Sequence, residues 1–132
     1  MTFRLKKISP VLQVESIEPV LSFWTERLGF QVTAEVPHGD HMGFVILEKD
    51  GYEVMYQTRA SVEADASTLA GHPLAGTILF IEVDDIDAIE SALADAEVLV
   101  PRRTTFYGST EIFVREPAGN VVGFAQFAAS QP

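Results

Sequence analysis

The stretch Ile17-Glu18-Pro19-Val20-Leu21-Ser22-Phe23-Trp24-Thr25-Glu26-Arg27-Leu28-Gly29-Phe30 combines the signals of one amphipathic helix and its end. Its apolar side chains recur at helical spacing, at Ile17, Val20, Leu21, Trp24 and Leu28. Ser16 is placed to be the N-cap, Pro19 suits the first turn, and Gly29 allows the left-handed residue that ends a helix. The pattern predicts a helix that covers a sheet, with Trp24 in the core.

Strand patterns flank this helix on both sides. The segment Ile8–Val14 before it alternates between two sets of side chains, as strands do. Three more strand candidates follow the helix, separated by turns that contain glycine and aspartate: Phe30–Val36, Met42–Glu48 and Tyr52–Gln57. The first part of the chain therefore has the order βαβββ.

The same order recurs in the second half. Thr77–Val83 repeats the opening strand, Asp85 is placed to cap a short helix, and the strand candidates that follow are Val98–Pro101, Thr110–Arg115 and Asn120–Phe127. An offset of 69 residues, 83 − 14, aligns apolar positions of the two halves. We predict a single α+β domain of two βαβββ modules. Module one covers about residues 5–58, a connector about 59–75, and module two about 76–128.

Composition limits the possible partners and chemistry. The 132 residues include no cysteine, so disulfides, thiolate nucleophiles and sulfur-ligated metals are excluded. The formal charge of −10 argues against nucleic acid and anionic membranes, because both require a cationic face. No apolar run is long enough to span a membrane, and the N-terminus has no signal-peptide pattern. We therefore expect a cytoplasmic protein with a small-molecule or protein partner.

Two motifs resemble those of the vicinal oxygen chelate superfamily, which includes glyoxalases, bleomycin-resistance proteins and extradiol dioxygenases. Phe23–Phe30 is similar to the family's helix end, where two aromatic residues precede Leu-Gly-Phe. Glu111–Asn120 is similar to its late strand, which leads into an acidic-Pro-x-Gly-Asn turn. The resemblance implies the glyoxalase/bleomycin resistance/dihydroxybiphenyl dioxygenase fold, with curled mixed sheets around a cavity, and a homodimer.

The resemblance also locates the positions that ligate a metal in the metal-dependent members. One ligand, usually His or Glu, comes from the first and fourth strands of each module, and the matching positions here are Ser9, Glu53, Ile78 and Gly123. A shift of one pleat would replace Glu53 with Met55. Because one carboxylate cannot hold a divalent cation, we expect no metal cofactor. His38 and His41 flank a predicted turn, and the sequence favours a solvated hairpin over a metal site there.

Strand alternation predicts an apolar groove with a few polar groups, which suits a small molecule. Glu53 is the best catalytic candidate. It is either an exposed strand carboxylate or a buried acid with a raised pKa that binds a cation or acts as a general base. Phe106 and Tyr107 either line the groove or pack ordinarily. Glu111 matches a glutamate of the family pattern, but an ion pair with Arg115 or Arg102 is an equal alternative, so we assign it no chemistry. The predicted ligand-binding residues are Gln13, His41, Glu53, Met55, Gln57, Phe80, Phe106 and Tyr107.

These observations favour a metal-independent protein that binds and sequesters a cationic or aromatic compound. One alternative is a glyoxalase-like lyase or isomerase, or a dioxygenase, with a non-standard or inter-subunit metal site. Such an enzyme would use Glu53 with His41 or with residues of a partner subunit. The other alternative is an interaction domain without a small ligand.

Overall fold

The computed structural model describes residues 2–128. Module one consists of β1 (Val11–Val14), α1 (Glu18–Ser22) with a π-helical turn (Phe23–Arg27), β2 (Gln31–His38), β3 (His41–Lys49) and β4 (Tyr52–Thr58). The connector contains α2 (Arg59–Ala66) and a 3-10 turn (Ser67–Leu69). Module two consists of β5 (Ile78–Glu82), α3 (Ile86–Ala92), β6 (Glu97–Thr104), β7 (Ser109–Arg115) and β8 (Val121–Phe127). The predicted α+β fold of two βαβββ modules is confirmed.

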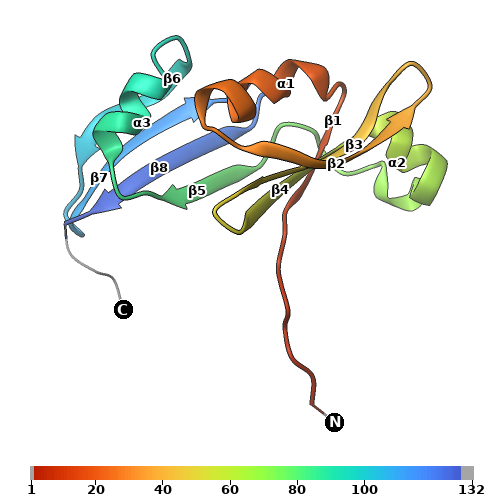
Figure 1. The fold of residues 1–132 in the computed structure, drawn as a ribbon, viewed down its shortest axis with the longest axis horizontal. Helices are drawn as coiled ribbons and strands as arrows, with labels where there is room; N and C mark the ends of the chain where they lie inside the picture. The colour runs from red at the N-terminus through yellow and green to blue at the C-terminus, as the bar shows by residue number, and fades with distance from the viewer. Residues whose placement is uncertain (1, 129–132) are drawn as a thin grey trace.

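Each module forms its own four-stranded mixed sheet. The strand orders are β1-β4-β3-β2 and β5-β8-β7-β6, and in each sheet the first strand runs parallel to the last strand of its module. The two sheets lie side by side, and the described strands pair only within their own sheet (Figure 1). Each sheet therefore has one face under the helices and one open face.

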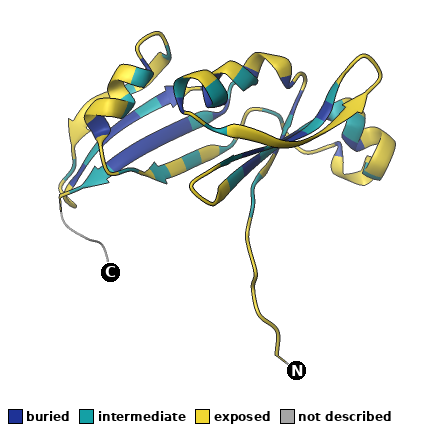
Figure 2. Ribbon diagram, in the orientation of Figure 1, coloured by how far each residue is buried: buried dark blue, intermediate teal, exposed yellow. Residues whose placement is uncertain are grey.

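The core lies between the helices and the covered faces of the sheets. Ile17, Val20 and Trp24 from the predicted stripe are fully buried, and Ile86 and Leu93 of the second module are buried with them. Figure 2 shows the burial as a dark band along β8, whereas β2 and β6 are mostly exposed. The predicted core position of Trp24 is confirmed.

The ends of the elements differ from expectation at two places. No side chain caps α1, whose N-cap is Ile17, so the predicted role of Ser16 is wrong. β1 begins at Val11 instead of Ile8, because Pro10 has no N–H to donate to a neighbouring strand. The predicted cap of α3 is confirmed, since the Asp85 carboxylate accepts the N–H of Ala88 at 3.1 Å.

Residues 2–10 form an extended N-terminal arm that projects away from both sheets (Figure 1). Phe3, Leu5 and Ile8 on this arm are strongly exposed. None of the helices within residues 2–128 is long and apolar enough to cross a membrane.

Candidate functional site

The open face of each sheet carries most of the predicted ligand-binding side chains. On the first sheet Gln13 is paired with Gln57 and Val11 with Met55, and on the second Phe80 is paired with Gly123. Paired residues share a face, so the predicted alternation is correct. Within one chain, however, Phe80 remains 52% exposed and its neighbour Ile78 65% exposed. The predicted groove is thus not closed by a single chain.

Glu53 lies at the end of the first sheet, where the N-terminal arm reaches it. Lys7 Nζ donates to Glu53 Oε2 at 2.9 Å, and Ser9 Oγ donates to the same oxygen at 3.2 Å. The hydrogen bond from Lys7 holds the pKa of Glu53 below its ordinary value. Of the two alternatives for Glu53, the buried acid with a raised pKa does not hold, because the arm supplies a lysine that no local sequence pattern connects with Glu53.

His41 and Glu53 lie at opposite ends of the first sheet. Glu53 pairs with Glu48, which is seven residues along β3 from His41. At about 3.3 Å per residue this is a separation of roughly 23 Å. His41 and Glu53, which the enzyme alternative would use together, therefore do not meet within one chain. His38 and His41 are exposed and flank the hairpin turn, as predicted.

The two glutamines of the first sheet contact the connector. Gln13 Nε2 donates to the carbonyl of His72 at 3.0 Å, and Gln57 Nε2 donates to Ser61 Oγ at 3.1 Å. A wide hollow of about 590 Å³ lies within the connector region, and Arg59, Glu63, Ser67, Ala70 and Gly71 line it. None of the predicted ligand-binding residues belongs to this hollow.

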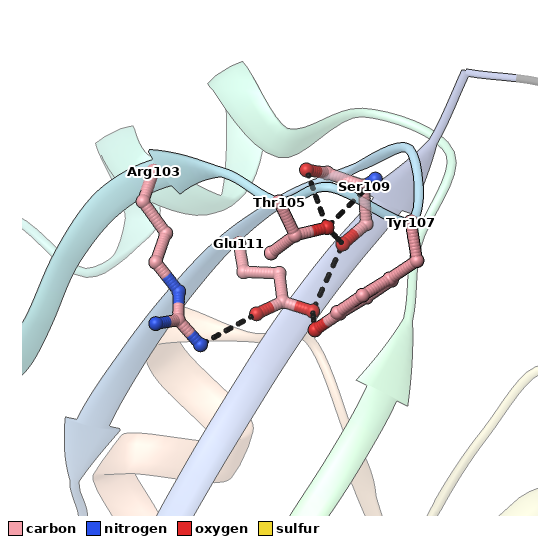
Figure 3. A network of polar contacts seen from close by, with 5 residues as sticks. All are labelled: Arg103, Thr105, Tyr107, Ser109 and Glu111. Carbon is pink, nitrogen blue, oxygen red and sulfur yellow. Dashed lines mark hydrogen bonds and ion pairs between the residues drawn. The ribbon is translucent and has the colours of Figure 1, made fainter.

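A polar network on the open face of the second sheet centres on Glu111, which is fully buried (Figure 3). Its carboxylate accepts hydrogen bonds from Tyr107 Oη at 2.5 Å, Ser109 Oγ at 2.9 Å and Arg103 Nη2 at 3.2 Å. Thr105 lies within 2.8 Å of Ser109, oxygen to oxygen, and completes the network. No chemical role was expected for Glu111 from the sequence.

The ion pair with Arg102 or Arg115 that was considered for Glu111 does not form. Arg102 contacts Asp87 and Glu90 on α3, and Arg115 contacts Glu97. An irregularity between Val100 and Arg103 shifts the register of β6, and this shift places Arg103 opposite Glu111.

Aromatic rings surround this network. Phe80 lies 6.2 Å from Phe113 between ring centroids, and Tyr107 lies 6.4 Å from Phe127. Phe106 packs against Tyr107 edge to face at 5.1 Å, yet remains 99% exposed. We call the rings of Phe80, Phe113 and Phe127 on the sheet, together with Tyr107 in the turn between β6 and β7, the aromatic face. In a single chain Phe106 neither packs in the core nor lines a closed pocket.

Burial of Glu111 raises its pKa, but the hydrogen bonds from Tyr107, Ser109 and Arg103 together lower it further. The net result is a pKa below the ordinary value of a glutamate. The carboxylate therefore stays ionised at neutral pH and is a poor general base. Its role is to hold Arg103 and Tyr107 in fixed positions on the open face.

The lowered pKa of Glu111 predicts a pH-dependent contribution to stability. A group with a lower pKa in the folded state stabilises the protein above its unfolded pKa, and this contribution is lost as pH falls through the folded pKa. We therefore expect Glu111→Gln to destabilise the protein at pH 7 and the difference from wild type to shrink below about pH 4.5. Urea unfolding across this range measures it. A difference that does not depend on pH would contradict the prediction.

The residues at the four family metal positions do not fit a divalent cation. Ser9 and Glu53 do meet, at 3.2 Å, but Glu53 is already paired with Lys7. Ile78 offers no donor atom. A methyl group added at Gly123 would come within 2.3 Å of the Phe113 ring, so that ring fills the space of a ligand side chain. In residues 2–128, no three His, Cys, Asp or Glu side chains are grouped as metal ligands would be.

A family model of the glyoxalase/bleomycin resistance protein/dioxygenase superfamily matches residues 6–124. The chain belongs to this superfamily. The match spans both modules and therefore includes strands of both open faces. No curated protein sequence matches the chain significantly.

Solved structures of other superfamily members share the fold at low sequence identity. A glyoxalase/bleomycin resistance protein/dioxygenase from Nocardioides has a TM-score of 0.73 at 15% identity, covering 99% of this chain and 90% of its own. A lactoylglutathione lyase from Agrobacterium tumefaciens has a TM-score of 0.73 at 18% identity, with 93% and 95% covered. An antibiotic binding protein from Streptomyces has a TM-score of 0.65 at 20% identity, with 96% and 100% covered. At these identities the likeness concerns the fold alone.

Proposed function

We propose that this superfamily member is a metal-independent binding protein for a small planar aromatic compound. The observation that carries the proposal is the aromatic face, where the rings of Phe80 and Tyr107 lie exposed beside a charged group that is fixed in position. Exposing the surface of an aromatic ring to water is unfavourable in free energy, and a ligand that stacks on the ring removes this cost. A structural relative described as an antibiotic binding protein supports the same class of function.

Arg103 provides the polar element of this site. Its guanidinium group carries five N–H donors and contacts Glu111 through one nitrogen, while its side chain remains about half exposed. An aromatic ligand with an anionic or carbonyl oxygen could pair with the remaining donors while its ring stacks on Phe80 or Tyr107. Because Glu53 and Glu111 are each paired with a basic side chain, the cationic class of ligand has less support than the aromatic one.

The enzyme alternative has weaker support than the binding function. A glyoxalase-like lyase or a dioxygenase would need a metal, and the donors at Ser9, Glu53, Ile78 and Gly123 do not fit one. The expected cytoplasmic location stays a prediction.

A melting-temperature series with small probes tests the proposal. We expect 2-naphthalenesulfonate, a planar aromatic anion, to raise the melting temperature in a concentration-dependent way, because a ligand that binds only the folded state stabilises it. Cyclohexanesulfonate is the non-aromatic control, and acridine orange represents aromatic cations. Equal shifts with the aromatic and the non-aromatic anion would contradict the proposed function.

Matched variants locate the binding site. Phe80→Ala and Arg103→Gln should each weaken binding of 2-naphthalenesulfonate by about tenfold, since each removes one recognition element. Tyr52→Ala removes an exposed aromatic side chain on the first sheet and should leave the affinity unchanged. Isothermal titration calorimetry gives the dissociation constants.

A further inference from the structure

The connector between the modules carries the hollow of about 590 Å³, which we call the connector hollow. It is built on α2, which packs on β1, β3 and β4 at the end of the molecule away from the second sheet (Figure 1). Its volume lies within the usual range of small-molecule sites. The connector hollow is therefore a second candidate binding site, remote from the aromatic face.

The lining of the connector hollow is polar and charged. Arg59 is basic, Glu63 is acidic and Ser67 carries a hydroxyl, whereas Ala70 and Gly71 offer little apolar surface. None of the described residues that line it is aromatic or has a branched apolar side chain. A ligand gains little here from the burial of apolar surface, so charge and hydrogen bonding must select it.

Arg59 has donors that the protein does not use. Its Nη2 donates to the carbonyl of His72 at 3.0 Å. Its Nε is buried and has no acceptor within residues 2–128. A buried donor without a partner is unfavourable, and a guanidinium group holds a carboxylate well through two parallel hydrogen bonds. These observations point to an anionic ligand group at Arg59.

Glu63 supplies the opposite charge one helical turn away from Arg59. Residues four positions apart in a helix lie on the same side, with about 5–6 Å between their Cβ atoms. Glu63 is exposed, and within residues 2–128 the two side chains form no ion pair with each other. The connector hollow thus presents one cation and one anion that remain separate.

A buried acceptor beside the connector hollow also lacks a partner. Gln13 Nε2 lies 3.5 Å from the carbonyl oxygen of Ala70, which is one of the lining residues. The other atom of this amide, Oε1, is buried and has no donor among the described residues. The region therefore has unused capacity for a ligand that both donates and accepts hydrogen bonds.

We propose that the connector hollow binds a small zwitterion, namely an α-amino acid with a short polar side chain. Arg59 pairs with the carboxylate of the ligand, and Glu63 pairs with its ammonium group. Both charged groups are attached to the same carbon atom, so a single molecule contacts two side chains one helical turn apart. The hydroxyl of Ser67 is available to a polar side chain of the ligand.

Three related compounds test the requirement for both charges by NMR titration of isotope-labelled protein. L-Serine has both charges, N-acetyl-L-serine lacks the ammonium group, and L-serinamide lacks the carboxylate. We expect L-serine to shift amide signals of residues 59–71 with a dissociation constant of about 1–10 mM, as suits a small polar ligand. Each analogue should bind about fivefold more weakly, since each loses one exposed ion pair. Equal affinities for L-serine and either analogue, or no saturation by about 100 mM, would overturn the proposal.

Matched variants locate the ligand. Glu63→Gln should weaken binding of L-serine about fivefold and leave the affinity for N-acetyl-L-serine unchanged, because that analogue has no ammonium group. Arg59→Gln should weaken L-serine to a similar extent and leave L-serinamide unchanged. Asp65→Asn removes an acidic charge of α2 outside the lining and serves as the control. An equal loss with Asp65→Asn and Glu63→Gln would mean that net charge alone matters, which contradicts the proposed site.

The amide spectrum of each variant verifies that the fold is intact. If Arg59→Gln disturbs the connector through the lost contact with His72, Glu63→Gln decides the test, because Glu63 is exposed. The connector hollow and the aromatic face share no residue, so the two sites are tested independently. Absence of L-serine binding contradicts the zwitterion site alone, and absence of 2-naphthalenesulfonate binding contradicts the proposed function alone.

Discussion

Replacing Trp24 with alanine is expected to lower the free energy of unfolding by about 4 kcal/mol, within the usual range for buried aromatic side chains. Trp24 is fully buried and packs edge to face against Phe23 at 5.4 Å and against Phe30 at 4.8 Å between ring centroids. Its Nε1 also donates to Tyr56 Oη at 2.9 Å. The substitution of Trp24 by alanine removes both the packing of the ring and this hydrogen bond.

Urea unfolding followed by circular dichroism measures this loss, because the variant has no tryptophan to report by fluorescence. Trp24→Phe should cost less, since it keeps an aromatic ring in most of the space. Leu69→Ala alters an exposed apolar side chain and serves as the control with a loss below about 0.5 kcal/mol. A loss below about 2 kcal/mol for Trp24→Ala would mean that the core repacks around the gap.

Replacing Glu116 with alanine should destabilise the protein by about 3 kcal/mol, because two buried donors lose their acceptor at about 1–3 kcal/mol each. Glu116 is buried in the turn between β7 and β8 and accepts from Tyr56 Oη at 2.6 Å. Its second oxygen accepts the backbone N–H of Asn120 at 2.8 Å. Burial is the main reason why the pKa of Tyr56 is raised, and the nearby Glu116 carboxylate raises it further. The Tyr56 hydroxyl therefore stays protonated and remains a donor.

A double-mutant cycle separates the contribution of Tyr56 from that of Asn120. Tyr56→Phe removes one donor, so Glu116→Ala should cost about 1–2 kcal/mol less in that background. Glu116→Gln keeps an acceptor oxygen and should be milder than alanine. If the stability losses of Glu116→Ala and Tyr56→Phe simply add in the double variant, the Tyr56 hydroxyl and the Glu116 carboxylate are not coupled.

The two-module architecture could be predicted because its signals are local. The helical stripe that contains Trp24, the cap at Asp85 and the glycine of the Glu116–Gly119 turn each depend on residues a few positions apart. The duplicated order then follows from repetition. The side-by-side arrangement of the two sheets is tertiary, and no periodicity in the sequence encodes it.

The candidate site could be predicted only in part, because its key contacts depend on register and on distant segments. Strand alternation correctly placed Phe80 and Gly123 on one face. The contact between Arg103 and Glu111 could not be predicted, because the irregularity in β6 changes which arginine faces Glu111, and a bulge of this kind leaves no clear sequence signal. Lys7 is 46 residues from Glu53, and only the path of the arm brings the two together.

The Phe113 ring in the space beside Gly123 has a consequence for any attempt to engineer this scaffold into a metalloenzyme. A carboxylate introduced at Gly123 alone would collide with the ring. A smaller residue would have to replace Phe113 at the same time, and Ile78 would still need exchange for a donor. Directed evolution by single substitutions thus starts at a barrier, whereas a library that varies these three positions jointly avoids it.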